Sequence, residues 1–137
     1  MELSPYLTFN GQCAEAFSFY ERCLGGKLIA MQTHGQSPMK DKVPADWRDK
    51  VLHARLDLGG GNVLMGSDAP PDHYEPPQGT HVSISVPSEA EAGRIFQALE
   101  ERGTVTMPFQ KTFWSPAFGM LVDRFGIPWI VNTEQAG

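Results

Sequence analysis

Several features that would define other classes of protein are missing from this 137-residue sequence. No apolar run approaches the roughly 20 residues that a membrane-spanning helix needs, so we expect no membrane role. Lysine and arginine are scattered and the net charge is -5, which argues against a nucleic-acid partner because phosphate binding needs clustered cations. With 41% apolar and 20% charged residues, the composition is that of an ordinary globular domain.

Cysteine is also scarce, since Cys13 and Cys23 are the only two. Both fall in or beside one predicted helix, where ten residues separate them by about 15 Å, too far for a mutual disulfide. We interpret Cys23 as a small core residue, with a reactive thiol as the alternative. Reduced thiols, together with a first segment (Met-Glu-Leu-Ser-Pro) that lacks the features of a secretory signal, lead us to expect a cytoplasmic protein.

A strand followed by a helix is predicted over residues 81–103. The first six residues alternate between polar and apolar, as in a strand that is covered on one face. A proline then ends the strand, Ser88 and Glu91 have the spacing of a helix capping box, and apolar residues recur at helical spacing until a glycine. The polar face, with His81 and Ser83, must look into something other than the helix layer. A cavity reached by solvent is the simplest candidate.

The same unit occurs earlier in the chain, over residues 5–26, so the sequence is interpreted as a duplication. Each copy is followed by two strands joined by a glycine-bearing turn, over residues 53–67 and 118–132. We therefore predict an α+β fold in which two βαβββ modules form a cup-shaped, eight-stranded mixed sheet with the helices on its outer face. The predicted boundaries are a first module at 1–68, a proline-rich linker at 69–80 and a second module at 81–137.

Two irregular connections carry aromatic residues. A polar connection from about residue 34 to residue 49 contains Trp47, which covers a cavity mouth if the connection is a lid. The alternative is a short helical turn that starts at Asp46 and is packed down by Trp47. The connection over residues 108–117 follows a predicted strand at 104–107. We expect its three aromatic rings to be buried against a cavity, a module junction or a second subunit.

The modules resemble the vicinal oxygen chelate superfamily of glyoxalases, bleomycin-resistance proteins and extradiol dioxygenases. The segments that carry the resemblance are Tyr6-Leu-Thr-Phe-Asn-Gly, Phe19-Tyr-Glu-Arg-Cys-Leu-Gly-Gly, His53-Ala-Arg-Leu, Val63-Leu-Met-Gly-Ser-Asp, Met107-Pro-Phe-Gln-Lys-Thr-Phe-Trp and Phe118-Gly-Met-Leu-Val-Asp-Arg-Phe-Gly. They look like the PhnB-like, demethylubiquinone methyltransferase-like branch. A methyltransferase, however, needs a glycine-rich loop between a strand and a helix to hold its cofactor, whereas the three glycines at 59–61 are predicted in a hairpin turn.

The resemblance also implies where a metal would bind. In metal-using members each module supplies one ligand from the start of its first strand and one from its last strand. By the repeat and the family pattern, these positions are Pro5, Met65, His81 and Ile130. Only the histidine suits a divalent ion, and a single imidazole does not hold one. We expect no metal and no cofactor. The alternative is a divalent metal for which His34 or His53 is recruited, although neither lies at a family ligand position.

Without a metal, the predicted cup becomes a binding site for a small molecule. If the glycine turns pair their strands, Arg55 faces Met65, His53 faces Ser67, Met120 faces Ile130 and Phe118 faces Asn132. The predicted cavity lining is then Phe9, Arg55, Met65, His81, Ser83, Phe118, Met120 and Asn132, mostly apolar with a few polar groups. Two alternatives stay open: Arg55 only pairs with Asp57 on a solvated strand, or His81 is a structural residue bonded to Ser83 or to a backbone carbonyl.

Two functions follow from these expectations. The favoured one is a metal-free protein that binds a planar, partly apolar and optionally anionic small molecule, as bleomycin-resistance relatives bind drugs. The alternative is a lyase, isomerase or dioxygenase that uses a divalent metal, or His81 as general base. We also expect a homodimer, formed through the aromatic connection from Phe109 to Trp114.

Overall fold

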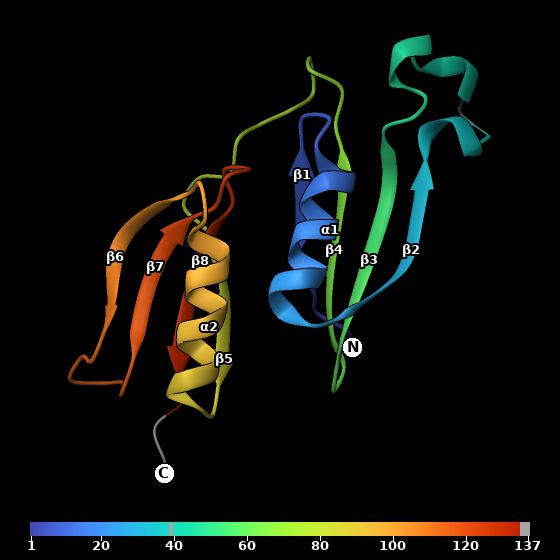
Figure 1. Ribbon diagram of the computed structural model, residues 1–137. Helices are drawn as coiled ribbons and strands as arrows, with labels where there is room; N and C mark the ends of the chain where they lie inside the picture. The colour runs from blue at the N-terminus through green and yellow to red at the C-terminus, as the bar shows by residue number, and fades with distance from the viewer. Residues whose placement is uncertain (39, 135–137) are drawn as a thin grey trace. The chain divides into compact units, whose positions relative to one another are not determined.

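The computed structural model describes residues 1–38 and 40–134. The chain divides into two compact units, Met1–Pro76 and Pro77–Gly137. In each unit a strand and a helix are followed by three more strands, so the predicted α+β fold with two βαβββ modules is confirmed (Figure 1). In the described part of the chain, no helix has both the length and the apolar character needed to cross a membrane.

The first unit is a four-stranded mixed sheet with one helix. Its elements are β1 (Tyr6–Phe9), α1 (Cys13–Leu24), β2 (Lys27–Thr33), β3 (Val51–Gly59) and β4 (Asn62–Asp68). The strand order is β1-β4-β3-β2, and β1 runs parallel to β4 while the other pairs are antiparallel. The connection between β2 and β3 contains three short 3₁₀ turns, at His34–Gln36, Lys40–Lys42 and Ala45–Trp47.

The last of these turns agrees with the interpretation of the 34–49 connection as a helical turn held by its tryptophan. The Trp47 ring lies against Gly11 in the turn between β1 and α1. The Lys50 ammonium donates to the carbonyl of the same glycine at 3.2 Å. The connection is therefore packed onto its own module.

The second unit repeats this topology. Its elements are β5 (Val82–Val86), α2 (Glu89–Glu100), β6 (Thr104–Gln110), β7 (Phe118–Val122) and β8 (Pro128–Thr133), and the strand order is β5-β8-β7-β6. β6 extends beyond the predicted strand at 104–107 and passes through Pro108. Because β6 is at the edge of its sheet, a proline within it removes no donor that the sheet needs.

Each helix packs closely on its sheet because a glycine faces an aromatic ring. In the first unit Phe17, which is fully buried, lies over Gly66 of β4. In the second unit Phe96 lies over Gly119 of β7 in the same way. The start of α2 is fixed by Ser88, whose hydroxyl oxygen accepts a hydrogen bond from the Glu91 amide at 3.3 Å.

One buried carboxylate in each unit gathers the hydrogen bonds of neighbouring loops. Asp68, at the end of β4, accepts from the amides of Gly11, Cys13 and Val51, each at 2.9 Å. Asp123 accepts from the amides of Phe125 and Ile127 at 2.8 and 3.0 Å and from the Trp129 indole at 2.8 Å. Both carboxylates therefore hold the loops of their own unit in place.

Candidate functional site

Each sheet has one face under its helix and an opposite face, which we call the open face. In the first unit the open face carries a row of three side chains, because Arg55 pairs with Met65 and Met65 pairs with Tyr6. The predicted pairing of Arg55 with Met65 is thus confirmed. The two side chains are in contact, with the guanidinium Nη1 lying 3.8 Å from the Met65 sulfur.

Arg55 forms an ion pair, but not with the residue that the sequence suggested. Its Nη2 lies 3.1 Å from Oε1 of Glu2, in the segment before β1, and the two side chains are 34% and 56% exposed. Asp57 instead accepts a hydrogen bond from the Gly59 amide in the hairpin turn at 2.9 Å. The open face therefore presents a guanidinium that is engaged by an acid from outside the sheet.

A pair of rings lies beside this row. Tyr6 and His53 stack with their centroids 5.9 Å apart and an interplanar angle of 25°. The Tyr6 hydroxyl is 3.4 Å from Nδ1 of the imidazole. Tyr6 remains 49% exposed, so the ring pair offers a flat surface next to Met65.

Phe9 does not belong to the open face, which corrects the predicted lining. It is 1% exposed and packs against Phe17 and Tyr20 of α1, with ring centroids at 6.1 and 6.4 Å. The cause is the parallel register, which pairs Phe9 with Asp68. Since Tyr6 is on the open face and side chains alternate along a strand, the third residue after Tyr6 must face the helix.

The open face of the second unit is more apolar. Met120 pairs with Ile130, and Phe118 pairs with Asn132, as predicted. Ser83 and Ser85 of β5 pair with Ile130 and Asn132 from the other side, also on this face. Asn132 donates weakly to Ser85 at 3.5 Å. Its side-chain oxygen is buried and has no hydrogen-bond partner among the described residues.

Two rings of the aromatic connection over residues 108–117 extend this face. Trp114 contacts Phe118 edge to face, with centroids 5.2 Å apart, and Phe113 contacts Trp114 in the same manner at 4.7 Å. Phe113 is 92% exposed and Trp114 45% exposed. Within the second unit these two rings are therefore not buried, and their burial at a module junction or a second subunit stays a prediction.

His81 is an exposed residue directly before β5. The residues that pair with Met65 and Ile130 are Tyr6 and Ser83, which are 77 positions apart (83 − 6), whereas the two helices start 76 positions apart (89 − 13). The turn before α1 is thus one residue longer than the turn before α2. The predicted match of Pro5 with His81 follows the spacing of the helices and is one residue away from the register of the strands. Tyr6 was therefore not predicted as a residue of the open face.

The side chains at these positions do not fit a resident divalent metal. The predicted positions Pro5, Met65, His81 and Ile130, together with Tyr6 and Ser83 on the paired strands, offer one imidazole, a thioether, a phenol and a hydroxyl, whereas a divalent ion such as zinc takes three or four imidazole, thiolate or carboxylate ligands. Within either unit, no three His, Cys, Asp or Glu side chains among residues 1–38 and 40–134 are grouped to hold an ion. The two histidines that could be recruited already have other contacts. The Nε2 atom of His34 lies 3.2 Å from the backbone oxygen of Asp68, and His53 contacts Tyr6.

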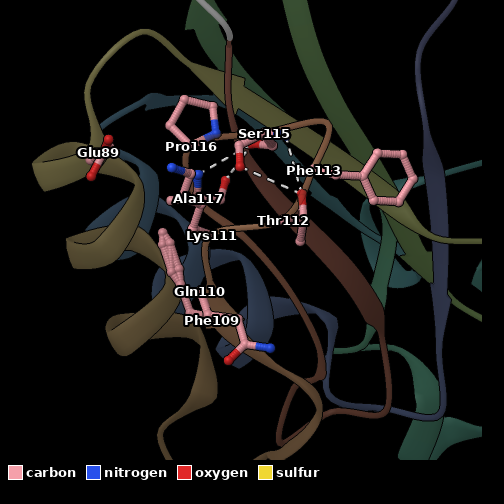
Figure 2. A pocket seen from close by; sticks show the side chains of 9 residues that line it. All are labelled: Glu89, Phe109, Gln110, Lys111, Thr112, Phe113, Ser115, Pro116 and Ala117. Carbon is pink, nitrogen blue, oxygen red and sulfur yellow. Dashed lines mark hydrogen bonds between the residues drawn. The ribbon is translucent and has the colours of Figure 1, made fainter.

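A separate pocket of about 720 Å³ lies in the second unit (Figure 2). It is lined by Glu89 at the start of α2 and by Phe109, Gln110, Lys111, Thr112, Phe113, Ser115, Pro116 and Ala117. Phe109 stacks on Phe96 of α2 at 5.2 Å, which puts this pocket on the helix side of the sheet. The predicted lining residues are not part of it.

Comparisons with known proteins match nearly the whole length of the chain. The model of the Glyoxalase/Bleomycin resistance protein/Dioxygenase superfamily matches residues 3–131. Protein YjdN of Escherichia coli (strain K12) is 32% identical, and the match covers 98% of this chain and 97% of that protein. The crystal structure of protein PA1353 from Pseudomonas aeruginosa is 51% identical, with a TM-score of 0.89 and 98% of each chain covered.

A third match agrees with the PhnB-like branch named from the sequence. The putative 3-demethylubiquinone-9 3-methyltransferase, PhnB protein, from Bacillus cereus has a TM-score of 0.77 at 22% identity, covering 97% of this chain and 99% of that one. At this identity the likeness speaks for the fold. Taken with the family match and the two closer relatives, the duplicated βαβββ architecture shows that the chain belongs to the Glyoxalase/Bleomycin resistance protein/Dioxygenase superfamily.

Proposed function

We propose that this protein binds a small, planar, partly apolar molecule on the open faces of its sheets, and that it does so without a resident metal. The observation that carries the proposal is the set of residues at and beside the positions at which the resemblance implies an ion (Pro5, Met65, His81 and Ile130), where a single imidazole is the only donor suited to a divalent metal. Tyr6 with Met65, and Ser83 with Ile130, bring aromatic, thioether and aliphatic contact surface in place of ligating groups. Such surface with a few polar groups is typical of small-molecule sites.

The first unit supplies the charged part of this surface. Arg55 is only one-third exposed and sits in contact with the Met65 thioether. A guanidinium in this setting recognises planar oxyanions through paired hydrogen bonds. The Tyr6–His53 ring pair beside it suits stacking with a flat ligand.

The second unit supplies an unsatisfied acceptor. A buried amide oxygen without a partner costs about 1 to 3 kcal/mol, and Asn132 carries such an oxygen. A hydroxyl or N–H of a bound molecule would satisfy it. The surrounding Phe118, Met120 and Ile130 side chains would contact the apolar body of that molecule.

The direct test combines elemental analysis of the purified protein with a thermal-shift screen of planar anionic and neutral compounds. We expect less than a tenth of a zinc, nickel, manganese or iron ion per chain, and ligands that raise the melting temperature. Arg55→Met should weaken anionic hits, while Arg22→Met, which removes an exposed cation from α1, should not. About one metal ion per chain would instead support a metal-dependent lyase, isomerase or dioxygenase.

His81 gives a second test of the same proposal. Because it is exposed and has no donor set beside it among the described residues of its unit, His81→Ala should leave metal content unchanged and ligand binding largely intact. If this substitution removed a bound metal together with a catalytic turnover, the metal-free proposal would be overturned.

We also propose that the protein acts as a homodimer. The support is an apolar surface on the second unit, where Phe113, Trp114, Val105 and Met107 are 92%, 45%, 39% and 36% exposed. Rings of this size are commonly covered at subunit contacts. Light scattering at tens of micromolar should return twice the 15.1 kDa chain mass. The double substitution Phe113→Ser/Trp114→Ser should return the monomer mass, and a monomeric parent protein would contradict the proposal.

A further inference from the structure

The acid that engages Arg55 comes from a segment with little packing of its own. Glu2 lies in the five residues before β1, which form neither helix nor strand. The side chains of its neighbours Met1 and Leu3 are essentially fully exposed. The contact of Glu2 with the guanidinium is therefore made by a segment that is free to give it up at small cost.

The strength of this ion pair supports the same view. Both side chains are partly exposed, at 34% and 56%, and pairs of this kind contribute only about 0 to 1 kcal/mol. A ligand carboxylate would make the same charge-assisted hydrogen bonds to Arg55 that Glu2 makes. The ligand would also make contacts that Glu2 lacks, because the group attached to its carboxylate would lie over the sheet.

The row on the open face determines what that body must be. Arg55, Met65 and Tyr6 stand on three adjacent strands in register, with neighbouring strands about 4.8 Å apart. A carboxylate bound at Arg55 therefore leads its attached group across the Met65 thioether towards the exposed Tyr6 ring. A flat apolar group fits this path, since thioether and ring both favour contact with an aromatic surface.

We infer that Glu2 occupies the place of a ligand's carboxylate on Arg55, and that the first unit selects planar aromatic carboxylates, which displace Glu2 when they bind. This inference rests on the proposed binding function and adds the ligand class and a competing residue. Glu2 acts as an internal competitor: it lowers the affinity for carboxylates and leaves the affinity for neutral analogues unchanged.

The experiment uses 2-naphthoate and its neutral analogue 2-naphthamide as probes. Binding to the full-length protein is measured by calorimetry at low salt, and the site is mapped by amide chemical shifts in β1, β3 and β4. Glu2→Gln should bind 2-naphthoate up to about fivefold more tightly, because a competitor of at most about 1 kcal/mol is removed. Its affinity for 2-naphthamide should not change. The gain should shrink in 1 M salt, where exposed charges are screened.

Two further variants isolate the contact. Arg55→Met should abolish the preference for 2-naphthoate over 2-naphthamide, and adding Glu2→Gln to it should have no further effect. Glu75→Gln removes the same charge from an exposed site and should leave both affinities unchanged. If Glu2→Gln does not alter 2-naphthoate binding, or improves both probes equally, the inference is overturned while the binding function stands. If neither probe binds the open face of any variant, both fail.

Discussion

In the two modules the same strand order is stabilised by buried carboxylates at different places. Asp68 is the last residue of the last strand of the first module, and it ties together the turn before α1 and the start of β3. Asp123 lies at the start of the last hairpin turn of the second module and holds that turn closed. The shared feature is the alternation of apolar residues under each helix. The topology therefore follows from this apolar pattern, whereas the carboxylates satisfy the loops that each module happens to have.

The open faces differ as well. The first module presents a guanidinium, an imidazole and a phenol ring around Met65, whereas the second presents Phe118, Met120 and an amide. A duplicated scaffold can thus carry open faces of different chemistry on its two modules. This contrast is the basis for assigning anion recognition to the first module alone.

Removing either carboxylate should have the largest effect on stability. Asp123→Ala and Asp68→Ala each remove the carboxylate that accepts from three donors, at sites 4% and 3% exposed. We expect each to lower the free energy of unfolding by about 3 to 5 kcal/mol, measured by urea denaturation. Asp49→Ala, at an exposed position, should change it by less than about 0.5 kcal/mol. A small effect of Asp68→Ala would mean that its loops are held by other contacts.

Sequence patterns were sufficient for the parts of the fold where neighbours along the chain decide the structure. The helices and the glycine-turn hairpins, with their pairing of Arg55 to Met65 and of Met120 to Ile130, follow from spacing alone. The side that Phe9 faces does not, because Tyr6-Leu-Thr-Phe has apolar residues at alternating and adjacent positions. Only the parallel pairing with β4, about 60 residues away, decides it.

The contact of Glu2 with Arg55 and the length of β6 could not be predicted from the sequence, for related reasons. A glutamate before a strand carries no signal of its partner, since the contact with Arg55 spans 53 residues. Pro108 argued against a continuing strand, and only its place at a sheet edge permits one. The candidate site was therefore predictable within each hairpin but not where distant segments meet.

Adding a methyl group between helix and sheet should have the next largest effect. A Cβ at Gly66 would come within 2.7 Å of the Phe17 ring and 2.8 Å of the Leu7 carbonyl oxygen, and one at Gly119 would come within 2.6 Å of Phe96. Gly66→Ala and Gly119→Ala should each cost about 1 to 3 kcal/mol through displacement of the helix. Urea denaturation of the two variants tests whether both modules depend equally on this contact. An effect in only one of them would show that the other helix can shift freely.

The first module should also lose stability at high pH, since it alone buries a thiol beside a carboxylate. Burial, and secondarily the charge of Asp68, raise the pKa of Cys13 far above its ordinary value of 9.0. Because the pKa of this thiol is raised in the folded state, its contribution to the free energy of unfolding is complete below pH 9. The contribution declines above pH 9, where only the unfolded chain releases the thiol proton. The decline should be about 1.4 kcal/mol per pH unit. Since the full slope is reached about one pH unit above 9, urea denaturation should show a total loss of about 1.4 kcal/mol between pH 8 and pH 10, which Cys13→Ala should remove.

The smallest expected effect comes from the position at which the two helices differ most. Phe17 of α1 corresponds to Gly93 of α2, because both stand four residues after the first residue of their helix. The ring at 17 is fully buried, whereas a Cβ at 93 would have no heavy atom within 4 Å. Gly93→Ala should therefore raise the free energy of unfolding by about 0.5 to 1 kcal/mol, as expected when alanine replaces glycine in a helix. The urea midpoint should increase at an unchanged slope. Gly103→Ala is the matched control: its Cβ would lie 2.5 Å from the Val122 carbonyl oxygen, so it should destabilise. A loss of stability in Gly93→Ala as well would mean that this side of α2 is covered in solution, as it would be by a second copy of the chain.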